Sequence, residues 1–307
     1  MYDLIIIGGG PAGSSAGIYS ARKKIKTLLV TKDFNGQSFL APDIQNWLGV
    51  QSISGKDFAK MIEKHIKSYE GDFLKIVEGK KVSYTEKTAD GFFTIKIKED
   101  LYKTKTVLIC TGGQRRKLEV PGATQFEQKG ITYCATCDAP MFSDKDVVVV
   151  GGGNSGFGSA IQLSEYAKNV TILEFAPQFN AEPIRVEEAL KKDNIKFIKN
   201  AEIKEILGEK MVTGLVYEDR ETKKRHGLAV TGVFVEIGMI PSTDFIKNLV
   251  EVDKYGYIKI NHQNQQTSTN GVWAAGDCTD SLYKQNIIAA GDGAKAVENI
   301  FHESKLN

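Results

Sequence analysis

The sequence predicts an α/β protein with two domains, the second inserted in the first. Its 307 residues fit about two domains of ordinary size. A short apolar strand that runs into a glycine-rich turn occurs twice, as MYDLIIIGGGPAG at residues 1–13 and as DVVVVGGGNSG at residues 146–156. After each copy, a helical pattern leads into another run rich in β-branched residues. Each copy is therefore expected to begin a βαβ unit.

Both turns have the glycine spacing GxGxxG. The glycines are Gly8, Gly10 and Gly13 in the first copy, and Gly151, Gly153 and Gly156 in the second. In this motif the first glycine makes the tight turn, the second lets the backbone approach a pyrophosphate, and the third lets helix and strand pack closely. The N–H groups of the helix N-terminus then face the phosphates. Two such turns predict two Rossmann-like, three-layer nucleotide-binding domains.

The elements after each turn follow in the same order in both copies. In the first unit we expect a helix over residues 14–22 and a strand over residues 26–30. In the second unit we expect a helix over residues 157–166 and a strand over residues 169–173. The repetition indicates that the two domains are built alike.

The segments that follow complete each domain. Residues 71–107 alternate apolar and polar side chains, which predicts an antiparallel sheet that ends in a buried strand. Residues 195–216 and 232–237 repeat this pattern. A third junction of strand and glycine turn, GVWAAGD at residues 271–277, precedes a helical pattern over residues 287–302. The first domain is therefore expected to resume after the second.

This order of elements sets the expected domain boundaries. Residues 1–113 and 244–307 are predicted to form one nucleotide-binding domain from the two ends of the chain. Residues 114–243 are predicted to form the inserted domain, which carries the second glycine turn.

Composition excludes several classes of partner. Lys and Arg number 40 against 38 Asp and Glu, so no excess of positive charge indicates a nucleic acid or an anionic membrane as a partner. The longest early apolar run, Leu4 to Ile7, is far too short to span a bilayer. Since the first residues do not have the pattern of a signal peptide, a cytoplasmic location is expected.

Two of the four cysteines are close together in the sequence. Cys134 and Cys137 form a CxxC motif within YCATCD, just ahead of the second βαβ unit. The pKa of a thiol in such a motif can be depressed, and the thiolate is the nucleophile that opens a disulfide. Asp138 can relay a proton as the thiols change state. Cys110 and Cys278 are expected to be core residues.

A zinc site and a structural disulfide are the competing interpretations of the CxxC motif. Structural zinc needs about four ligands, but the chain has no second CxxC and its four histidines show no ligand spacing. No metal is therefore expected. Structural disulfides are rare in cytosolic proteins. A redox-active pair is the favoured interpretation.

Taken together, the motifs resemble a known family. The first glycine turn, YCATCD, the second glycine turn and GVWAAGD match, in order and spacing, the low-molecular-weight thioredoxin reductases, which are pyridine nucleotide-disulfide flavoenzymes. The resemblance implies an FAD domain made from the two chain ends, an inserted nicotinamide-nucleotide domain, a homodimer, and a thioredoxin-like protein as the disulfide substrate. It also implies that the inserted domain swivels about hinges near residues 113–117 and 241–245.

The resemblance assigns roles to individual residues. Cys137 is expected to face the flavin and Cys134 to attack the partner protein, with Asp138 as the proton relay. The residues expected to bind FAD are Gly8, Gly10, Pro11, Ala12, Gly13, Gly36, Gln37, Asn46, Thr111, Gly112, Gly276, Asp277, Lys284 and Gln285. Those expected to bind the nicotinamide nucleotide are Gly151, Gly153, Asn154, Ser155, Gly156 and Glu174.

Glu174 departs from the pattern of the NADPH-using members. Those enzymes carry a His-Arg-Arg run where this chain has Glu174, Phe175 and Ala176. A carboxylate suits the ribose 2′-OH of NAD and repels a 2′-phosphate. One charge pair at contact distance is worth about 1 kcal/mol in water and about 4 kcal/mol at an effective dielectric constant of about 20. NADH is therefore expected to be preferred, and the string LEFAP resembles the NADH-using flavoprotein subunit of alkyl hydroperoxide reductase.

A second departure leaves the electron donor open. Both related groups usually place a Glu at the position of Gly158, close to where the nicotinamide approaches the flavin. Because this chain has no carboxylate at that position, two alternatives to NADH as the electron donor stay open. The protein can take electrons from a non-nicotinamide donor such as ferredoxin, or it can be a redox-sensing flavoprotein with a vestigial nicotinamide site.

Overall fold

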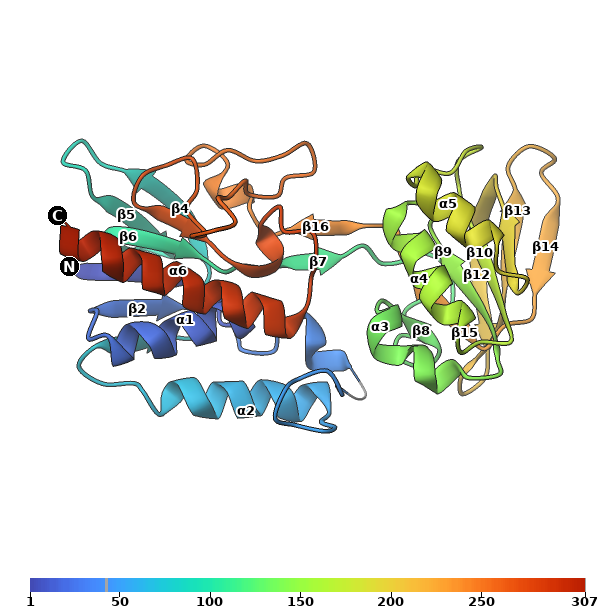
Figure 1. The fold of residues 1–307 in the computed structure, drawn as a ribbon, viewed down its shortest axis with the longest axis horizontal. Helices are drawn as coiled ribbons and strands as arrows, with labels where there is room; N and C mark the ends of the chain where they lie inside the picture. Colours follow the sequence, from blue (N-terminus) through green and yellow to red (C-terminus); the bar gives the residue numbers. More distant parts are fainter. Residues whose placement is uncertain (42–43, 307) are drawn as a thin grey trace. The chain divides into compact units, whose positions relative to one another are not determined.

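A computed structural model describes residues 1–41 and 44–306 of the chain. The chain divides into two compact units, of which unit 1 comprises Met1–Gln114 and Ile240–Asn307, and unit 2 comprises Arg115–Met239 (Figure 1). The predicted α/β class, with the second domain inserted in the first, is confirmed.

The second crossing between the units falls four residues before the expected position at residue 243. The residues that follow this crossing form hydrogen bonds with unit 1. The Ser242 N–H donates to the Gly112 carbonyl over 3.0 Å. The Thr243 hydroxyl donates to the Gly256 carbonyl over 2.7 Å. These bonds attach the segment after Pro241 to unit 1.

Unit 1 is built on a seven-stranded sheet of order β3-β2-β1-β6-β5-β4, with β17 paired to β6. The strands are β1 (Tyr2–Ile7), β2 (Thr27–Val30), β3 (Leu74–Val77), β4 (Val82–Lys87), β5 (Phe93–Ile97), β6 (Asp100–Ile109) and β17 (Val272–Ala274). The start of β6 pairs antiparallel with β5, and its later part pairs parallel with β1. The antiparallel prediction for residues 71–107 is wrong for β3, which pairs parallel with β2 because a crossover helix, α2 (Gly55–Lys67), separates the two strands.

Helices cover one face of this sheet. They are α1 (Pro11–Arg22), α2 (Gly55–Lys67) and α6 (Asn286–Leu306), and the short 3₁₀ turns are η1 (Gln37–Leu40), η3 (Asp244–Ile246) and η4 (Gly276–Cys278). In β1, Leu4 and Ile6 pack into the core shared with α1 and α6, while Ile5 and Ile7 pack into a second core with β5 and β17. The alternation of β1 side chains thus joins two cores across one sheet, which gives three layers.

Unit 2 contains a five-stranded parallel sheet of order β11-β10-β9-β15-β8. Its strands are β8 (Ile131–Thr132), β9 (Asp146–Val150), β10 (Asn169–Leu173), β11 (Ile195–Ile198) and β15 (Gly232–Val235). The predicted strand at residues 169–173 is confirmed. The antiparallel prediction for residues 195–216 is wrong for the first strand of that segment, β11, which pairs parallel with β10.

Two further layers enclose this sheet. The helical layer contains α3 (Ala135–Asp138), η2 (Ala139–Phe142), α4 (Asn154–Ser164) and α5 (Pro183–Leu190). The opposite layer is an antiparallel sheet of β12 (Ala201–Gly208), β13 (Val212–Asp219) and β14 (Arg225–Leu228). Val147 and Val149 of β9 pack in the core with α4, whereas Val148 and Val150 pack in the core with β12 and β13.

The chain passes between the units twice, through two strands that pair with each other. These strands, β7 (Gly113–Arg115) and β16 (Met239–Pro241), form a two-stranded sheet. Among the residues that the structure describes, no helix has both the length and the apolar character needed to cross a bilayer.

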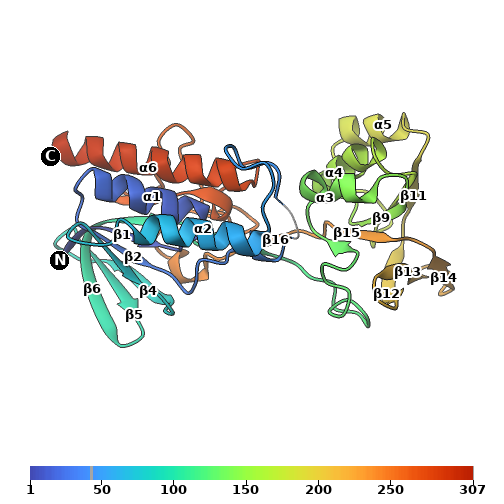
Figure 2. The same ribbon diagram turned by 90° about the horizontal axis from the view of Figure 1, so that it is seen from below.

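The close packing of α1 against α6 in unit 1 can be tested by substitution. The two helices run alongside each other in both views (Figures 1 and 2). A Cβ atom on Gly293 of α6 would lie 2.0 Å from the Ala12 carbonyl oxygen of α1. We expect Gly293→Ala to lower the free energy of unfolding by about 1 to 3 kcal/mol through overpacking, as measured by urea denaturation.

Gly291 is the matched control for this prediction. It lies in the same helix, but a Cβ atom there would meet no atom within 4 Å. Gly291→Ala should leave the stability unchanged or raise it by up to about 1 kcal/mol, because alanine favours the helix. Equal effects of the two substitutions would contradict the close helix contact.

Candidate functional site

The first glycine turn joins β1 to α1 at the carboxyl edge of the unit 1 sheet. Gly8 has φ +114°, and a Cβ atom on Gly13 would lie 1.9 Å from the Gly8 carbonyl oxygen. Gly10 caps α1 without a side-chain hydrogen bond, and a Cβ atom there would meet nothing within 4 Å. The first turn of α1, which begins with Pro11, has no acidic residue. We call the open space over Gly10 and the N-terminus of α1 the first cradle. It fits the pyrophosphate of FAD.

Hydrogen bonds join the two chain ends around this turn. Gln37 Nε2 donates to Asp277 Oδ2 over 3.1 Å, and Asn46 Nδ2 donates to Gln285 Oε1 over 3.1 Å. Gly36 caps η1 and lies exposed beside Gln37. Predicted FAD residues from distant parts of the sequence are therefore brought together.

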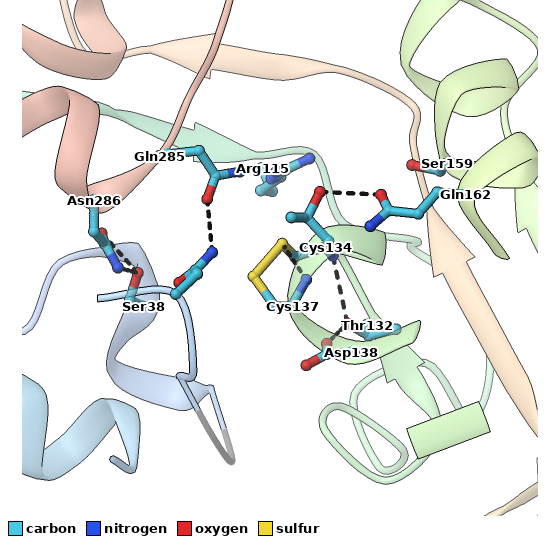
Figure 3. The surroundings of a disulfide bond; sticks show 12 residues. Ser38, Arg115, Thr132, Cys134, Cys137, Asp138, Ser159, Gln162, Gln285 and Asn286 are labelled. Atoms are coloured by element: carbon cyan, nitrogen blue, oxygen red, sulfur yellow. Dashed lines mark hydrogen bonds between the residues drawn. A yellow bond between two sulfur atoms is a disulfide. The ribbon is translucent and has the colours of Figure 1, made fainter. Parts of the chain in front are cut away.

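Sequence reasoning missed a third link between the same segments. Ser38 and Asn286 exchange hydrogen bonds of 3.0 and 2.9 Å (Figure 3). Asn286 begins α6, so the bond holds the start of this helix against η1. In the sequence, Ser38 follows the predicted Gln37 and Asn286 follows the predicted Gln285, and this adjacency could have indicated the link.

The remaining predicted FAD residues lie at the end of β6 and around η4. Because β1 and β6 are neighbours, Thr111 and Gly112 follow β6 beside the first glycine turn. The Thr111 hydroxyl donates to the Ser242 carbonyl over 2.7 Å. A Cβ atom on Gly276 would lie 3.1 Å from Ala12 Cβ, so η4 packs closely on α1.

Lys284 is held inside unit 1 rather than extended into solvent. Its Nζ donates to the Thr279 carbonyl over 2.5 Å and lies 4.5 Å from the centroid of the Tyr257 ring. Burial lowers the pKa of Lys284, while the nearby charge of Asp277 opposes this shift. Cys110 and Cys278 are both buried, as the sequence predicts.

The second glycine turn repeats the geometry of the first in unit 2. Gly151 has φ +117°, and a Cβ atom on Gly156 would lie 1.8 Å from the Gly151 carbonyl oxygen. Gly153 caps α4 without a side-chain hydrogen bond, and a Cβ atom there would meet nothing within 4 Å. Asn154 Oδ1 accepts a hydrogen bond from the Glu182 N–H over 2.7 Å, and Ser155 lies exposed. The open space over Gly153 and the N-terminus of α4, the second cradle, fits a second dinucleotide.

Glu174 lies directly after β10, beside the second turn. Its carboxylate accepts hydrogen bonds from the N–H groups of Gly152 and Ala176. The carboxylate is thus fixed at the edge of the turn, where the remaining lone pairs suit a ribose hydroxyl group.

Sequence reasoning missed Arg220, which lies against the residue after Glu174. Its guanidinium carbon lies 3.7 Å from the centroid of the half-exposed Phe175 ring, and its Nη1 donates to the Phe175 carbonyl.

The two cysteines of the CxxC motif form a disulfide at the start of α3 (Figure 3). Both are partly exposed, and the Cys137 N–H donates to Cys134 Sγ over 3.2 Å. The Thr132 hydroxyl donates to the buried Asp138 carboxylate, and the Cys134 N–H points at the Thr132 hydroxyl over 3.4 Å. Thr132, which sequence reasoning missed, therefore connects the predicted proton relay to the dithiol.

A second carboxylate in unit 2, that of Glu236, was also missed. Glu236 follows β15, and its side chain is 7% exposed. Its Oε1 accepts from Ser159 Oγ over 2.7 Å, and its Oε2 lies 3.2 Å from Arg115 Nη1. Burial raises the pKa of Glu236, whereas Arg115 and Ser159 oppose the shift. An acidic residue directly after a buried strand was the available signal.

Gly158 lies in α4, next to Ser159. A Cβ atom on Gly158 would lie 3.4 Å from Arg185 Nη1 of the neighbouring helix α5. This position therefore faces a cation and provides no carboxylate of its own.

Two dinucleotide cradles and a disulfide in one chain define an oxidoreductase class that combines nucleotide cofactors with a cysteine pair. Residues 2–294 match the family described as pyridine nucleotide-disulphide oxidoreductase, and the chain belongs to that family. Family membership confirms the predicted cofactors, FAD and a nicotinamide nucleotide. The preference for NADH over NADPH stays a prediction.

Similar proteins carry different names. The chain is 40% identical over 301 residues to an NADH dehydrogenase of Bacillus subtilis, and 39% identical over 300 residues to a subunit of the alkyl hydroperoxide reductase of Staphylococcus aureus. Each alignment covers 98% of this chain but 58% of the relative, so the chain spans little more than half the length of these proteins.

A solved structure matches over its whole length. The thioredoxin reductase from Streptococcus pyogenes has a TM-score of 0.91 and 33% identity, and the alignment covers 100% of this chain and 99% of that one. The predicted resemblance to low-molecular-weight thioredoxin reductases is confirmed at the level of family and fold.

The role of the first cradle can be tested at Gly10. Because a Cβ atom there meets no atom of the chain, Gly10→Ala should fold normally, but the methyl group would take the space of the pyrophosphate. We expect FAD affinity to fall by about tenfold or more, as measured by flavin absorbance after dialysis. Gly153→Ala, at the same position of the second cradle, is the control and should keep its flavin. A Gly10→Ala protein with full flavin content would contradict the assignment.

Proposed function

We propose that the protein is a flavin-dependent disulfide reductase that passes electrons from NADH, through Cys134 and Cys137, to a thioredoxin-like protein. The observation that carries the proposal is the position of the disulfide, which lies in the same compact unit as the second cradle and Glu174. A chain with only one nucleotide cradle, or without the disulfide, could not link these partners. The name of the thioredoxin reductase that matches over its full length supports a thioredoxin substrate.

Unit 1 would hold FAD through its two chain ends. Gly10 and the start of α1 would bind the pyrophosphate, while Asp277, oriented by Gln37, would accept hydrogen bonds from the cofactor's hydroxyl groups. When bound, FAD supplies two-electron transfer between the nicotinamide and the disulfide. The homodimer predicted from the resemblance stays a prediction.

The thiols of unit 2 would carry out the exchange with the substrate. The Cys134 thiolate attacks one sulfur of the substrate disulfide, which forms a mixed disulfide and releases one substrate thiolate. Cys137 then attacks Cys134 Sγ, which restores the Cys134–Cys137 disulfide and releases the second thiolate. The N–H of Cys137, directed at Cys134 Sγ, would stabilise the attacking thiolate. Asp138, bonded to Thr132, would relay the protons that the released thiolates take up.

One observation favours a second candidate function. Gly158 provides no carboxylate and faces Arg185. The same protein would then receive its electrons from a non-nicotinamide donor such as ferredoxin, or act as a redox sensor. Stopped-flow bleaching of the flavin by NADH, NADPH and reduced ferredoxin separates these functions.

The roles of the two cysteines predict different outcomes of serine substitution. Cys134→Ser should abolish turnover with a thioredoxin-like substrate while FAD stays bound, because the attacking sulfur is lost. Cys137→Ser should instead trap a covalent adduct through Cys134, because nothing resolves the mixed disulfide. Non-reducing electrophoresis and mass spectrometry detect the adduct. Trapping in Cys134→Ser, but not in Cys137→Ser, would reverse the assignment.

The charge of Glu174 predicts the choice of nicotinamide cofactor. We expect the wild type to prefer NADH, and Glu174→Gln to shift the ratio of kcat/KM values toward NADPH by about fivefold or more, because the repulsion of the 2′-phosphate is removed. Arg220→Gln is the control, since its guanidinium is engaged by Phe175 and should not set the preference. Equal use of NADPH by the wild type, lost in Arg220→Gln, would show that Arg220 binds the 2′-phosphate.

A further inference from the structure

The order of strands in unit 2 separates two carboxylates across the second cradle. In the sheet, β10 and β15 lie on opposite sides of β9. The cradle follows β9, Glu174 follows β10, and Glu236 follows β15. Ligands of such sheets bind outside the carboxyl ends of the strands, at the point where the strand order reverses. A dinucleotide whose pyrophosphate lies in the cradle extends one nucleoside toward each carboxylate.

The backbone of Glu236 lies directly against the cradle. A Cβ atom on Gly151 would lie 2.3 Å from the Glu236 carbonyl oxygen. Its carboxylate is fixed by Ser159 and Arg115, so both oxygens have a defined direction. Each carboxylate oxygen has two lone pairs, and these two contacts use one on each oxygen. The group can therefore accept further hydrogen bonds from a ligand, but it cannot donate one while it is ionised.

The same side of α4 links Glu236 to the dithiol. Ser159 bonds to Glu236, and Gln162, one helical turn further along α4, accepts a hydrogen bond from the Thr136 hydroxyl over 3.1 Å. In the sequence, Thr136 lies between the two cysteines. In the proposed function, the nicotinamide and the dithiol are the two groups of unit 2 that exchange electrons with the flavin. Because Glu236 and the dithiol lie along the same side of α4, we infer that the Glu236 end of the cradle is the nicotinamide end.

We propose that Glu236 binds the carboxamide of the nicotinamide and selects it against a carboxylate at the same position. The inference rests on the proposed function, because it takes the ligand of the second cradle to be a nicotinamide dinucleotide. The amide group of the carboxamide donates two hydrogen bonds, and the Glu236 carboxylate accepts them. A dinucleotide that carries nicotinic acid instead places a negative charge against Glu236 and loses both bonds.

Binding of three nucleotides to the flavin-loaded protein tests this inference by calorimetry. NAD⁺ carries the carboxamide, nicotinic acid adenine dinucleotide carries a carboxylate, and ADP-ribose has neither group. We expect the wild type to bind NAD⁺ about tenfold more tightly than the nicotinic acid analogue. Glu236→Gln should weaken NAD⁺ binding and strengthen binding of the analogue, because its amide can donate to a carboxylate. ADP-ribose should bind equally to both proteins.

Glu218→Gln is the matched control. Glu218 is a partly buried carboxylate of the same unit that pairs with Lys204 and Arg225 in the three-stranded sheet, the layer opposite α4. This variant should bind all three nucleotides as the wild type does. Unchanged ADP-ribose binding in Glu236→Gln also demonstrates that the variant is folded.

The outcomes separate this inference from the proposed function. An unchanged ratio of NAD⁺ to analogue affinity in Glu236→Gln, or an equal loss of ADP-ribose binding, would overturn the inference. A wild type that binds none of the three nucleotides would overturn both the inference and the use of NADH. If the ratio shifts as expected but NADH fails to reduce the flavin of the wild type, the inference stands and the proposed electron donor is wrong.

Discussion

The contact on which both nucleotide cradles depend is the approach of the third glycine of each turn to the carbonyl of the first. A Cβ atom on Gly13 or Gly156 would lie within 2 Å of the carbonyl oxygen of Gly8 or Gly151, respectively. This contact presses the first turn of the helix against the end of the strand. The uncapped N–H groups of α1 and α4 then point over the edge of each sheet. Every other group in either candidate site is positioned relative to that edge.

The strand order decides which side chains reach the cradles. In unit 1 the neighbour of β1 is β6, and the residue directly after that strand is the buried Cys110, whose carbonyl lies against Gly8 as that of Glu236 lies against Gly151. In unit 2 the corresponding neighbour of β9 is β15, and it is followed by a carboxylate held by an ion pair. Two domains with the same turn therefore offer different chemistry at the reversal point.

Local sequence patterns predict the glycine turns, the CxxC motif, the strand at residues 169–173 and the burial of Cys110. These features depend on residues close together in the chain. The directions of β3 and β11 were not predicted, because periodicity identifies a strand without identifying its neighbour. The partners of Glu236 lie 77 and 121 residues away in the sequence. Such contacts arise only when distant parts of the chain come together in the fold, so a single sequence does not contain a local signal for them.

The pairing of β7 with β16 has a consequence for the modular construction of the chain. The inserted unit begins and ends on two hydrogen-bonded strands, so its own termini are neighbours, and so are the two host residues Gln114 and Ile240 that flank it. A short turn between those residues would close unit 1 without moving any strand of its sheet. Unit 2 can accordingly be gained, lost or exchanged as one block. This arrangement allows a nucleotide-binding unit with different specificity to be transplanted onto an unaltered flavin-binding host.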